Sequence, residues 1–523
     1  MRGAVAGGHP LTAEAGARVL AEGGNAVDAC IAAAFASAVT ESPLTGPGSG
    51  GFMLIHRARD RSTRIADFFV TTPGLGLDHL RGGAMKTVDV GFGGDNETKQ
   101  LFRIGEASCA VPGTILGLAT THKAFGKLPW AELVAPAIEF ARAGVVLSRE
   151  QAHLQLLLDP ILRLTDEGRK IYSPHGNRFV AGQTMAFNDL ADTLEAIQKE
   201  GAAAFYRGER AHAMVTTIRE GGGDLTQADL DAFRVIWRQP VRATFRGHEF
   251  LSNPPPSSGA VLIAYGLAIL ERLGDTRQGS AEAIATIAEV MREQTRARGG
   301  SFASELHRGG LASRLLADSE IAAAINRITE RAPAVTEHAP YGGTTHVSVI
   351  DGDGNAASLS TSTGSGSGVI IPGTGIYMNN MLGEYDLVVG HTPRPGRRLT
   401  SMMSPSVALD PSGRTRLVVG SAGSARLRGA IMQIVVNVIQ HGMGVEDAIA
   451  APRVHVDEPH LHCEGGHDQA ELDRLEEQGY DVVRWRRRNL FFGGAAGVEV
   501  RADGTLAAAG DPRRGGAGFV VSA

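Results

Sequence analysis

The chain has 523 residues, more than a typical single domain, so it can bury a large core as two domains or as one elaborate α/β unit. Its 51 basic and 56 acidic residues give a formal net charge of −5, which excludes the positive footprint of a nucleic-acid-binding protein. The three cysteines, Cys30, Cys109 and Cys463, lie far apart and show neither metal nor disulfide spacing, so we predict buried, unreactive thiols.

The first ten residues, MRGAVAGGHP, lack the apolar segment of a signal peptide. No apolar run reaches the length that is needed to cross a bilayer. We therefore predict a cytoplasmic protein that contacts neither membrane nor nucleic acid.

Two helices are predicted near the N-terminus. The first covers residues 12–22, with Thr12 as its N-cap and Gly23-Gly24 as its stop. Asn25 then caps a second helix, which runs to Val39 and is apolar nearly all round. A helix with so little polar surface is usually buried, so we place it in the core.

Residues 46–51 read GPGSGG and satisfy the GxGxxG pattern of dinucleotide-binding loops. That interpretation requires a strand before the motif and a helix after it. Here a helix precedes the motif and an apolar strand over residues 52–56 follows it. We therefore predict no cofactor, and we interpret the glycines as a tight turn that enters a central strand near a site.

The middle of the chain alternates between helical and strand-like stretches. Residues 63–70 are predicted as a second strand, residues 111–143 and 148–205 as mainly helical, and residues 235–251 as strand-like. Residues 254–259, PPPSSG, form a locally rigid entrance to a helix over 260–273. A largely helical stretch over 281–331 leads into an unpatterned connector, 332–341, which is a natural place for an exposed cut.

The stretch GGTTHVSVID, residues 342–351, alternates apolar and polar residues and predicts a half-buried strand. Asp351 opens a turn, and residues 356–362 return as the second strand of a hairpin. Thr344 Oγ can attack the Gly343 carbonyl, because no side chain at Gly343 blocks the approach. Cleavage would leave Thr344 with a free α-amine beside its own hydroxyl, an activated nucleophile. The plainer alternative is a threonine that merely starts a strand.

Two glycine-rich loops follow the hairpin. Residues 361–368, TSTGSGSG, have the composition of a flexible linker but lie between two strands, which favours a hydroxyl-rich loop beside a nucleophile. Strands are predicted over 375–380, 404–409 and 414–419. Residues 420–424, GSAGS, then lead into a helix over 425–441. A glycine turn at a helix N-terminus presents backbone N–H groups, which suit an anion or an oxyanion.

Together these segments resemble the γ-glutamyltranspeptidase family of N-terminal-nucleophile hydrolases, over nearly the whole chain. The resemblance rests on segments in family order, at residues 23–29, 50–53, 254–259, 344–348, 353–355, 375–380, 401–405, 451–453 and 510–513. It implies an α/β (α+β) fold, a four-layer αββα sandwich, without cofactor or metal. It also implies one precursor cut into a large subunit, residues 1–343, and a small subunit, residues 344–523.

The same resemblance assigns the catalytic roles. Thr344 is similar to the family nucleophile, and its freed amine would act as the general base. Backbone N–H groups of Gly423 and Ser424 would hold the tetrahedral oxyanion. Ser362 falls where the family has a threonine that hydrogen-bonds the nucleophile.

The substrate-binding residues match only in part. Thr400 and Ser401 correspond to a serine pair that binds the α-carboxylate of the γ-glutamyl group, and Asn380 lies in the strand that lines the pocket. Glu384 stands where the family has an acidic residue, usually aspartate, for the α-amine. Phe69 replaces the arginine that anchors the α-carboxylate.

Three further departures surround this pocket. Met381 stands where a polar side chain is usual, and Gly364 where an asparagine is expected. The chain between Glu384 and Arg397 is too short for the usual lid loop. An alternative anchor for the carboxylate is Arg397 or its neighbour Arg398, either of which could reach into the pocket.

The resemblance implies transfer of an acyl group from an amide, through a threonyl ester, to water or an amine. Our first hypothesis is a γ-glutamyltransferase or glutathione hydrolase acting on a glutathione-like γ-glutamyl amide. The second is an acylase of the same fold that acts on a glutaryl or β-lactam-type side-chain amide. The third is a non-catalytic scaffold. The expected partners are a small-molecule substrate and the two subunits themselves, with a homo-oligomer of the cleaved pair left open.

Overall fold

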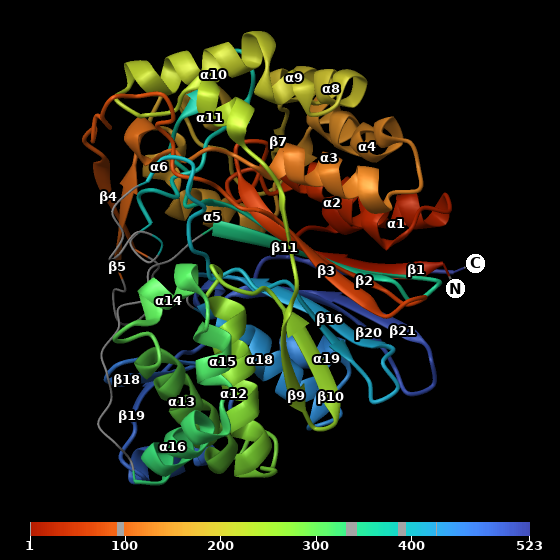
Figure 1. Ribbon diagram of the computed structural model, residues 1–523, viewed down its shortest axis with the longest axis vertical. Helices are drawn as coiled ribbons and strands as arrows, with labels where there is room; N and C mark the ends of the chain where they lie inside the picture. The colour runs from red at the N-terminus through yellow and green to blue at the C-terminus, as the bar shows by residue number, and fades with distance from the viewer. Residues whose placement is uncertain are drawn as a thin grey trace.

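The computed structural model describes residues 2–91, 99–330, 343–384, 387, 394–424 and 426–522, and the statements below concern these residues. Two antiparallel sheets lie face to face, and helices cover the outer face of each sheet, as Figure 1 shows. This helix–sheet–sheet–helix order agrees with the predicted αββα sandwich. In this part of the chain, no helix is long and apolar enough to cross a membrane.

The first sheet has seven strands in the order β22-β1-β11-β12-β2-β3-β8. Their bounds, in that order, are Ala517–Val521, Gly3–Gly7, Gly343–Asp351, Ala356–Gly364, Gly50–Arg57, Ser62–Phe68 and Ile236–Arg238. The hairpin predicted around residues 351–355 is present, because β11 and β12 pair antiparallel with Val347 opposite Leu359.

The second sheet has six strands in the order β21-β20-β16-β15-β10-β9. Their bounds, in that order, are Leu506–Gly510, Gly494–Val500, Thr415–Ala422, Ser406–Leu409, His248–Ser252 and Val241–Phe245. Strand β16 of this sheet contacts both β11 and β12 of the first, so the two sheets meet along the predicted hairpin.

Successive side chains of β11 point alternately to the two faces of the first sheet, so they join two different core layers. Val347 and Val349 join the core beneath the first helix layer, whereas Ile350 joins the apolar core between the sheets. His346 also lies between the sheets, where its ring bonds Ser360 Oγ at 2.8 Å and Ser348 Oγ at 3.0 Å. Burial lowers the pKa of His346 to about 3, so this histidine is neutral and structural.

The first helix layer packs on the seven-stranded sheet. It is built from α1 (Pro10–Ala21), α2 (Ala26–Thr40), α3 (Thr114–Phe125), α4 (Trp130–Ala143) and α8 (Asn188–Glu200). Asn25 caps α2 in a capping box with Asp28, and every side chain of α2 is buried, as its apolar sequence predicted. The predicted N-cap of α1 is wrong: His9 caps it, and Thr12 instead bonds Thr40 at 2.7 Å.

The second helix layer packs on the six-stranded sheet. It comprises α12 (Gly259–Leu273), α13 (Ala281–Arg296), α16 (Asp318–Thr329), α18 (Arg426–Ile439) and α19 (Val445–Ala450). The PPPSSG segment ends at the first residue of α12, as predicted. The connector at residues 332–341 lies outside the described residues.

Shorter elements complete the chain. The helices are α5 (Arg149–Leu157), α6 (Asp159–Leu162), α7 (Asp166–Tyr172), α9 (Ala203–Tyr206), α10 (Gly208–Glu220), α11 (Gln227–Ala232), α14 (Phe302–Arg308), α15 (Leu311–Leu315) and α20 (Gln469–Glu477), with 3-10 turns η1 (Glu106–Ser108) and η2 (Leu490–Phe492). The small sheets are β4 (Lys86–Gly91) with β5 (Lys99–Ile104), β6 (Val145–Val146) with β7 (Thr184–Met185), β13 (Ile370–Ile371) with β14 (Ile376–Tyr377), and β17 (Val454–Asp457) with β18 (His460–Cys463) and β19 (Asp481–Arg484).

The GPGSGG segment forms a turn that leads into β2, as predicted. Ser49 N donates to the Gly46 carbonyl at 3.1 Å, and Gly48 forms a bridge with Met378. A Cβ atom at Gly48 would lie 2.2 Å from the Tyr377 carbonyl oxygen, so the glycine permits close backbone packing. The predicted strand over 375–380 is shorter, since β14 covers Ile376–Tyr377.

Strands from both sides of the Gly343–Thr344 bond interleave in both sheets. In the first sheet, β1 pairs with β11 and β22, and β12 pairs with β2. In the second, β10 pairs with β15. A division into residues 1–343 and 344–523 stays a prediction, and these two parts would share both sheets rather than form separate domains.

Candidate active site

Thr344 is the second residue of β11, at a point where the pairing with β12 is irregular between Gly343 and Thr345. Its side chain is buried and lines a cavity that is partly open to solvent. The cavity wall comprises Phe69, Thr344, Ser362, Gly364, Met381, Glu384, Leu387, Ser401, Met402, Met403, Ser424 and Leu427. Predicted catalytic and binding residues separated by more than 300 positions therefore share one cavity.

A chain of hydroxyl groups connects Thr344 with the bond that precedes it. Thr344 Oγ1 donates to Ser362 Oγ at 3.3 Å, and Ser362 Oγ donates to the carbonyl oxygen of Gly343. The backbone N–H of Gly364 donates to Ser362 Oγ at 2.9 Å and fixes that hydroxyl. Ser362 is thus placed to polarise the Gly343 carbonyl while it accepts the hydrogen bond of the threonine.

Gly343 is required by packing as well as by access to its carbonyl. A Cβ atom at this position would lie 2.4 Å from the Gly364 carbonyl oxygen and 3.0 Å from Leu44 Cδ2. Any larger residue would push β11 away from β12 and displace Thr344 from Ser362.

Glu41 supports the opposite face of the same strand. The adjacent Thr345 donates from Oγ1 to Glu41 Oε2 at 2.6 Å, and Thr12 donates to Oε1 at 3.1 Å. Burial raises the pKa of Glu41, and these two hydrogen bonds and the charge of Arg514 oppose the shift. Glu41 was not among the predicted site residues, although this carboxylate directly follows an alanine-rich helix that was predicted to be buried.

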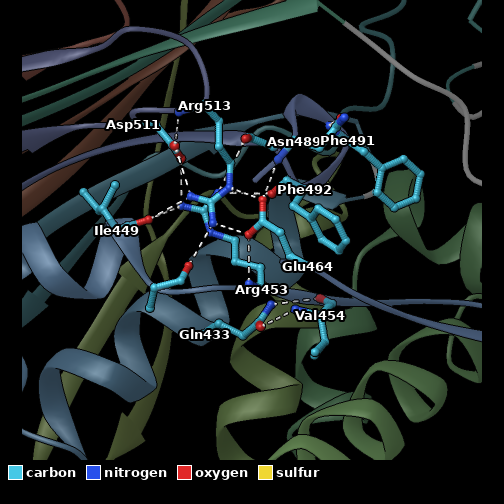
Figure 2. Close-up of polar contacts among 12 residues, drawn as sticks. Gln433, Ile449, Arg453, Val454, Glu464, Asn489, Phe491, Phe492, Asp511 and Arg513 are labelled. Carbon is cyan, nitrogen blue, oxygen red and sulfur yellow. Dashed lines mark hydrogen bonds and ion pairs between the residues drawn. The ribbon is translucent and has the colours of Figure 1, made fainter. Parts of the chain in front are cut away.

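Arg514 holds the carbonyl oxygen of the nucleophile, since its Nη1 lies 2.5 Å from Thr344 O. The preceding Arg513 belongs to a buried ion network with Arg453, Glu464 and Asp511, which Figure 2 shows. Arg453 Nη2 lies 2.7 Å from Asp511 Oδ2, and Arg513 Nε donates to Glu464 Oε1 at 2.7 Å. The network therefore fixes the segment that presents Arg514 to the nucleophile.

The same network reaches the turn between β16 and α18. Arg453 Nη1 donates to the Phe492 carbonyl at 3.1 Å, and Asp511 Oδ2 accepts from Ala495 N at 2.8 Å. These residues flank Gly493, whose Cα would lie 3.1 Å from a Cβ atom at Gly423. Residues 451–453 and 510–513 were predicted to be important only through the family resemblance. In the structure, their charged side chains belong to one buried ion network.

The turn at Gly423 and Ser424 has an unusual backbone. Gly423 has φ of 122° and Ser424 has φ of 52°, a region that non-glycine residues seldom adopt. Ser424 lines the cavity, and α18 begins two residues later, at Arg426. Among the described atoms, none accepts a hydrogen bond from the N–H of Gly423 or Ser424. The turn therefore has the geometry of an oxyanion site, with the positive end of the helix dipole behind it.

Phe69 forms an apolar part of the cavity wall. Its ring stacks on that of Phe52 at a centroid distance of 5.4 Å, and 1% of the residue is exposed. Asp67 Oδ1 accepts from the backbone N–H of Phe69 at 3.0 Å and fixes the strand end. The structure thus places a hydrocarbon ring where the resemblance implied a cation.

Arg398 serves the back of this wall rather than the cavity. It forms an ion pair with Asp67 at 3.2 Å, donates to the carbonyls of Phe69 and Arg234, and lies over the ring of Phe233. Neither Arg398 nor the half-buried Arg397 is among the described residues that line the cavity. The alternative that one of them replaces the carboxylate anchor has no support in this structure.

Asn380 and Glu384 both bind the turn that follows Ser362. The Ser365 backbone N–H donates to Asn380 Oδ1 at 2.9 Å and to Glu384 Oε1 at 3.1 Å. Glu384 lines the cavity, whereas Asn380 is not among the described residues that line it, and its role in substrate binding stays a prediction. Gly364 has φ of 74°, and a Cβ atom there would lie 2.0 Å from Asn380 Oδ1, which excludes the asparagine of the family pattern.

Thr400 and Ser401 take different positions. Ser401 lines the cavity, and its carbonyl accepts from the Ser258 N–H at 2.7 Å, so the PPPSSG segment supports it. Thr400 does not line the cavity; its hydroxyl donates to the Leu387 carbonyl at 3.2 Å. Most of the segment between Glu384 and Arg397, which was predicted to be too short for the usual lid loop, lies outside the described residues.

Comparison with known proteins agrees with this geometry. The family model for gamma-glutamyltranspeptidase matches residues 12–521. An acylase ACY 1 proenzyme from Pseudomonas sp. strain SE83 is 32% identical, over 100% of this chain and 94% of the relative. A glutathione hydrolase proenzyme from Pseudomonas aeruginosa is 31% identical, over 99% and 94%.

The structure also resembles the crystal structure of cephalosporin acylase from Bacillus halodurans. The TM-score is 0.86 at 25% sequence identity, with 100% of this chain and 96% of that one covered. Sequence, fold and the cavity around Thr344 lead to one conclusion. The chain belongs to the γ-glutamyltranspeptidase family of N-terminal-nucleophile hydrolases, and it is an enzyme.

Proposed function

We propose that this protein is cut between Gly343 and Thr344 and then transfers the acyl group of a γ-glutamyl amide, such as glutathione, to water or to an amine. The observation that carries the proposal is the position of Thr344 Oγ1, in the cavity wall, hydrogen-bonded to Ser362, with Ser424 in the same wall. The relatives that are named proenzymes support a precursor that matures by cleavage.

The contacts in the uncut chain support a path for maturation. Thr344 Oγ1 attacks the Gly343 carbonyl carbon, whose oxygen is polarised by the Ser362 hydroxyl. The new C–O bond replaces the peptide C–N bond, and the proton of the hydroxyl passes to the departing nitrogen. Water then hydrolyses the ester, which leaves a carboxylate at Gly343 and a free α-amine on Thr344.

The mature residue would use the same hydroxyl on substrate. Its α-amine takes the proton of Oγ1 as the oxygen attacks the donor amide, and gives that proton to the leaving amine. The N–H groups of Gly423 and Ser424 stabilise the oxyanion. Water or a second amine then releases the acyl group from the threonyl ester.

The part of the cavity wall that contains Glu384 and Ser401 favours a small polar acyl group. Glu384 supplies a carboxylate for the α-amine of a γ-glutamyl group, and Ser401 supplies a hydroxyl for its carboxylate. Glutathione hydrolase proenzymes among the relatives support the same donor.

A second candidate is an acylase for another side-chain amide. It is favoured by the apolar wall that Phe69, Met381, Met402 and Met403 form, and by the relatives that are acylases. Both candidates use the same chemistry at Thr344, so they differ only in the acyl group.

The direct test is an anilide assay with the purified, cleaved protein. We expect release of 4-nitroaniline from γ-glutamyl 4-nitroanilide, and none from the Thr344→Ala variant. An intact single chain without activity would instead support the scaffold hypothesis. The cytoplasmic location and a homo-oligomer of the cleaved pair stay predictions, which cell fractionation and light scattering would test.

A further inference from the structure

The nucleophile lies at an irregularly paired end of its strand. The pairing of β11 with β12 is irregular between Gly343 and Thr345, so that the register skips Thr344. Strand β1, on the other side of β11, pairs with it from Ser348 onwards. The proposed cut would also remove the peptide bond that holds Thr344 from its N-terminal side. Contacts other than strand pairing are therefore needed to fix the mature nucleophile.

One such contact comes from the side chain of the next residue. Thr345 points to the helix-covered face of the sheet, away from the cavity that Thr344 lines, and its Oγ1 donates to Glu41 Oε2 at 2.6 Å. The other carboxyl oxygen, Oε1, accepts from Thr12 Oγ1 at 3.1 Å. All three of these side chains are buried, so bulk water does not replace a hydrogen bond that is lost there.

The carboxyl group of Glu41 is held in place by the backbone around it. Glu41 directly follows α2, and its N–H donates to the Ser37 carbonyl at 2.8 Å. A Cβ atom at Gly8 would lie 2.1 Å from Glu41 Oε2, so the turn between β1 and α1 closes over the carboxyl group. Glu41 therefore offers Thr345 an acceptor in a fixed position.

The four residues after Glu41 also hold the partner strand, β12. Thr45 Oγ1 lies 2.6 Å from Thr361 Oγ1. The Thr363 N–H donates to the Leu44 carbonyl at 3.0 Å. The end of α2 and the residues after it thus fix both strands of the hairpin at the end where the nucleophile lies.

We propose that Thr345 and Glu41 are positioning residues: once the bond before Thr344 is cut, their hydrogen bond holds the backbone of the new N-terminal residue in reach of the donor amide. This inference rests on the proposed cleavage and acyl transfer at Thr344. Before the cut, the peptide bond to Gly343 shares that task, so loss of the contact should affect turnover more than maturation.

Thr345→Val is the informative variant, because valine keeps the branched shape of threonine and removes its hydroxyl group. We expect the variant to be cut as wild type is. Its kcat should fall about tenfold or more, with KM within about twofold of wild type, because a buried carboxyl group loses its partner on the strand of the nucleophile. The donor is whichever of γ-glutamyl and glutaryl 4-nitroanilide the wild-type enzyme hydrolyses faster. Thr345→Ser keeps the hydroxyl group and should recover most of kcat.

Thr12→Val is the matched control. Thr12 is buried like Thr345 and donates to the same carboxyl group, but it lies on α1 rather than on the strand of the nucleophile. We expect the two valine variants to lose similar stability in urea, and Thr12→Val to keep kcat within about twofold of wild type. An equal loss of kcat in both variants would show that they only weaken the core, and would overturn the inference.

A double-mutant cycle tests the contact from its other side. Glu41→Leu removes the acceptor, so kcat should fall as in Thr345→Val, and the double variant should be no slower than either single variant. Losses that multiply would show that the two side chains act separately, and would overturn the inference but not the proposed function. A Thr345→Val variant that keeps the wild-type kcat, or that folds but stays uncut, would do the same. Wild-type protein that stays uncut, or that hydrolyses neither donor, would overturn the proposed function and this inference with it.

Discussion

Arg514 donates a hydrogen bond to the carbonyl oxygen of Thr344, 2.5 Å away, and so ties the nucleophile to a buried ion network. Arg513, the residue before it, is bound by Glu464 and Asp511, and Asp511 also binds Arg453. The network joins segments that are far apart in sequence at the point where the backbone of Thr344 must be held still. Positioning of the nucleophile is thus built into the core of the part of the chain that follows Gly343.

Removal of the Arg514 side chain should therefore affect the chemical step. We expect Arg514→Leu to lower kcat by about 10- to 150-fold with little change in KM, because a charge-assisted hydrogen bond contributes about 1.5–3 kcal/mol. Arg514→Lys keeps the charge but not the planar guanidinium and should recover part of the loss. Steady-state kinetics of the two variants check this, and an unchanged kcat in Arg514→Leu would disprove the positioning role.

The turn at Gly423 and Ser424 gives a second prediction. Gly423→Ala forces a side chain onto a backbone with φ of 122° and into contact with Gly493, so the oxyanion N–H groups should shift. We expect a loss of about 100- to 1,000-fold in the acylation rate, the effect of losing one oxyanion donor. Single-turnover kinetics would measure it.

Ser424→Gly is the matched control for that turn. Glycine adopts φ of 52° without strain and keeps the backbone N–H, so acylation should stay close to the wild-type rate. A proline at 424 would be less informative, because its fixed φ near −65° would distort the turn as well as remove the donor. If Ser424→Gly were as slow as Gly423→Ala, the serine hydroxyl rather than the backbone would be required.

Local signals in the sequence were sufficient for much of the fold. The apolar–polar alternation of residues 342–351 predicted β11 and its hairpin, but the prediction that the strand is half-buried is wrong. Both faces of β11 are buried, because polar side chains such as that of His346 lie between the two sheets. The order of helix, GPGSGG and strand excluded a dinucleotide loop, and the structure has a close-packed turn there. Asn25 and its apolar helix predicted α2.

Side-chain partners across long stretches of chain were not predictable in the same way. Asp511 and Arg453 are 58 residues apart, and neither local pattern reveals that they pair. The Oδ1 atom of Asn380 accepts a hydrogen bond from the Ser365 N–H, a contact that no local pattern in the sequence indicates. Such orientations depend on tertiary packing, which a single sequence does not encode locally.

Gly364 provides a stability test with a built-in control. In Gly364→Ala the new Cβ atom would lie 2.0 Å from Asn380 Oδ1, whereas Gly373, with φ of 68°, has open space around the same position. We expect Gly373→Ala to lower the free energy of unfolding by about 1–2 kcal/mol, the cost of left-handed backbone. Gly364→Ala should cost about 2–5 kcal/mol, because overpacking is added. Urea unfolding of both variants measures the difference, and equal losses would contradict the described contact.

The raised pKa of Glu41 should make the free energy of unfolding depend on pH. Because its pKa is raised above the usual 4.5, the folded protein keeps this proton over a pH range in which the unfolded chain has lost it. Within that range, the contribution of Glu41 to the free energy of unfolding falls as the pH rises. Glu41→Gln cannot titrate, so its stability relative to wild type should increase from about pH 4.5 upwards. Denaturant unfolding across pH 4 to 8 measures this, and a constant difference would refute the buried, proton-binding state.

The central claim is that Thr344 becomes the N-terminal residue of a small subunit and acts there as the nucleophile. N-terminal sequencing of the purified protein, combined with intact mass measurement, tests it most directly. We predict two fragments, the smaller beginning Thr344-Thr345-His346, and a single uncut, inactive chain for Thr344→Ala. A wild-type chain that stays intact, or a small fragment that begins at any other residue, would contradict this account.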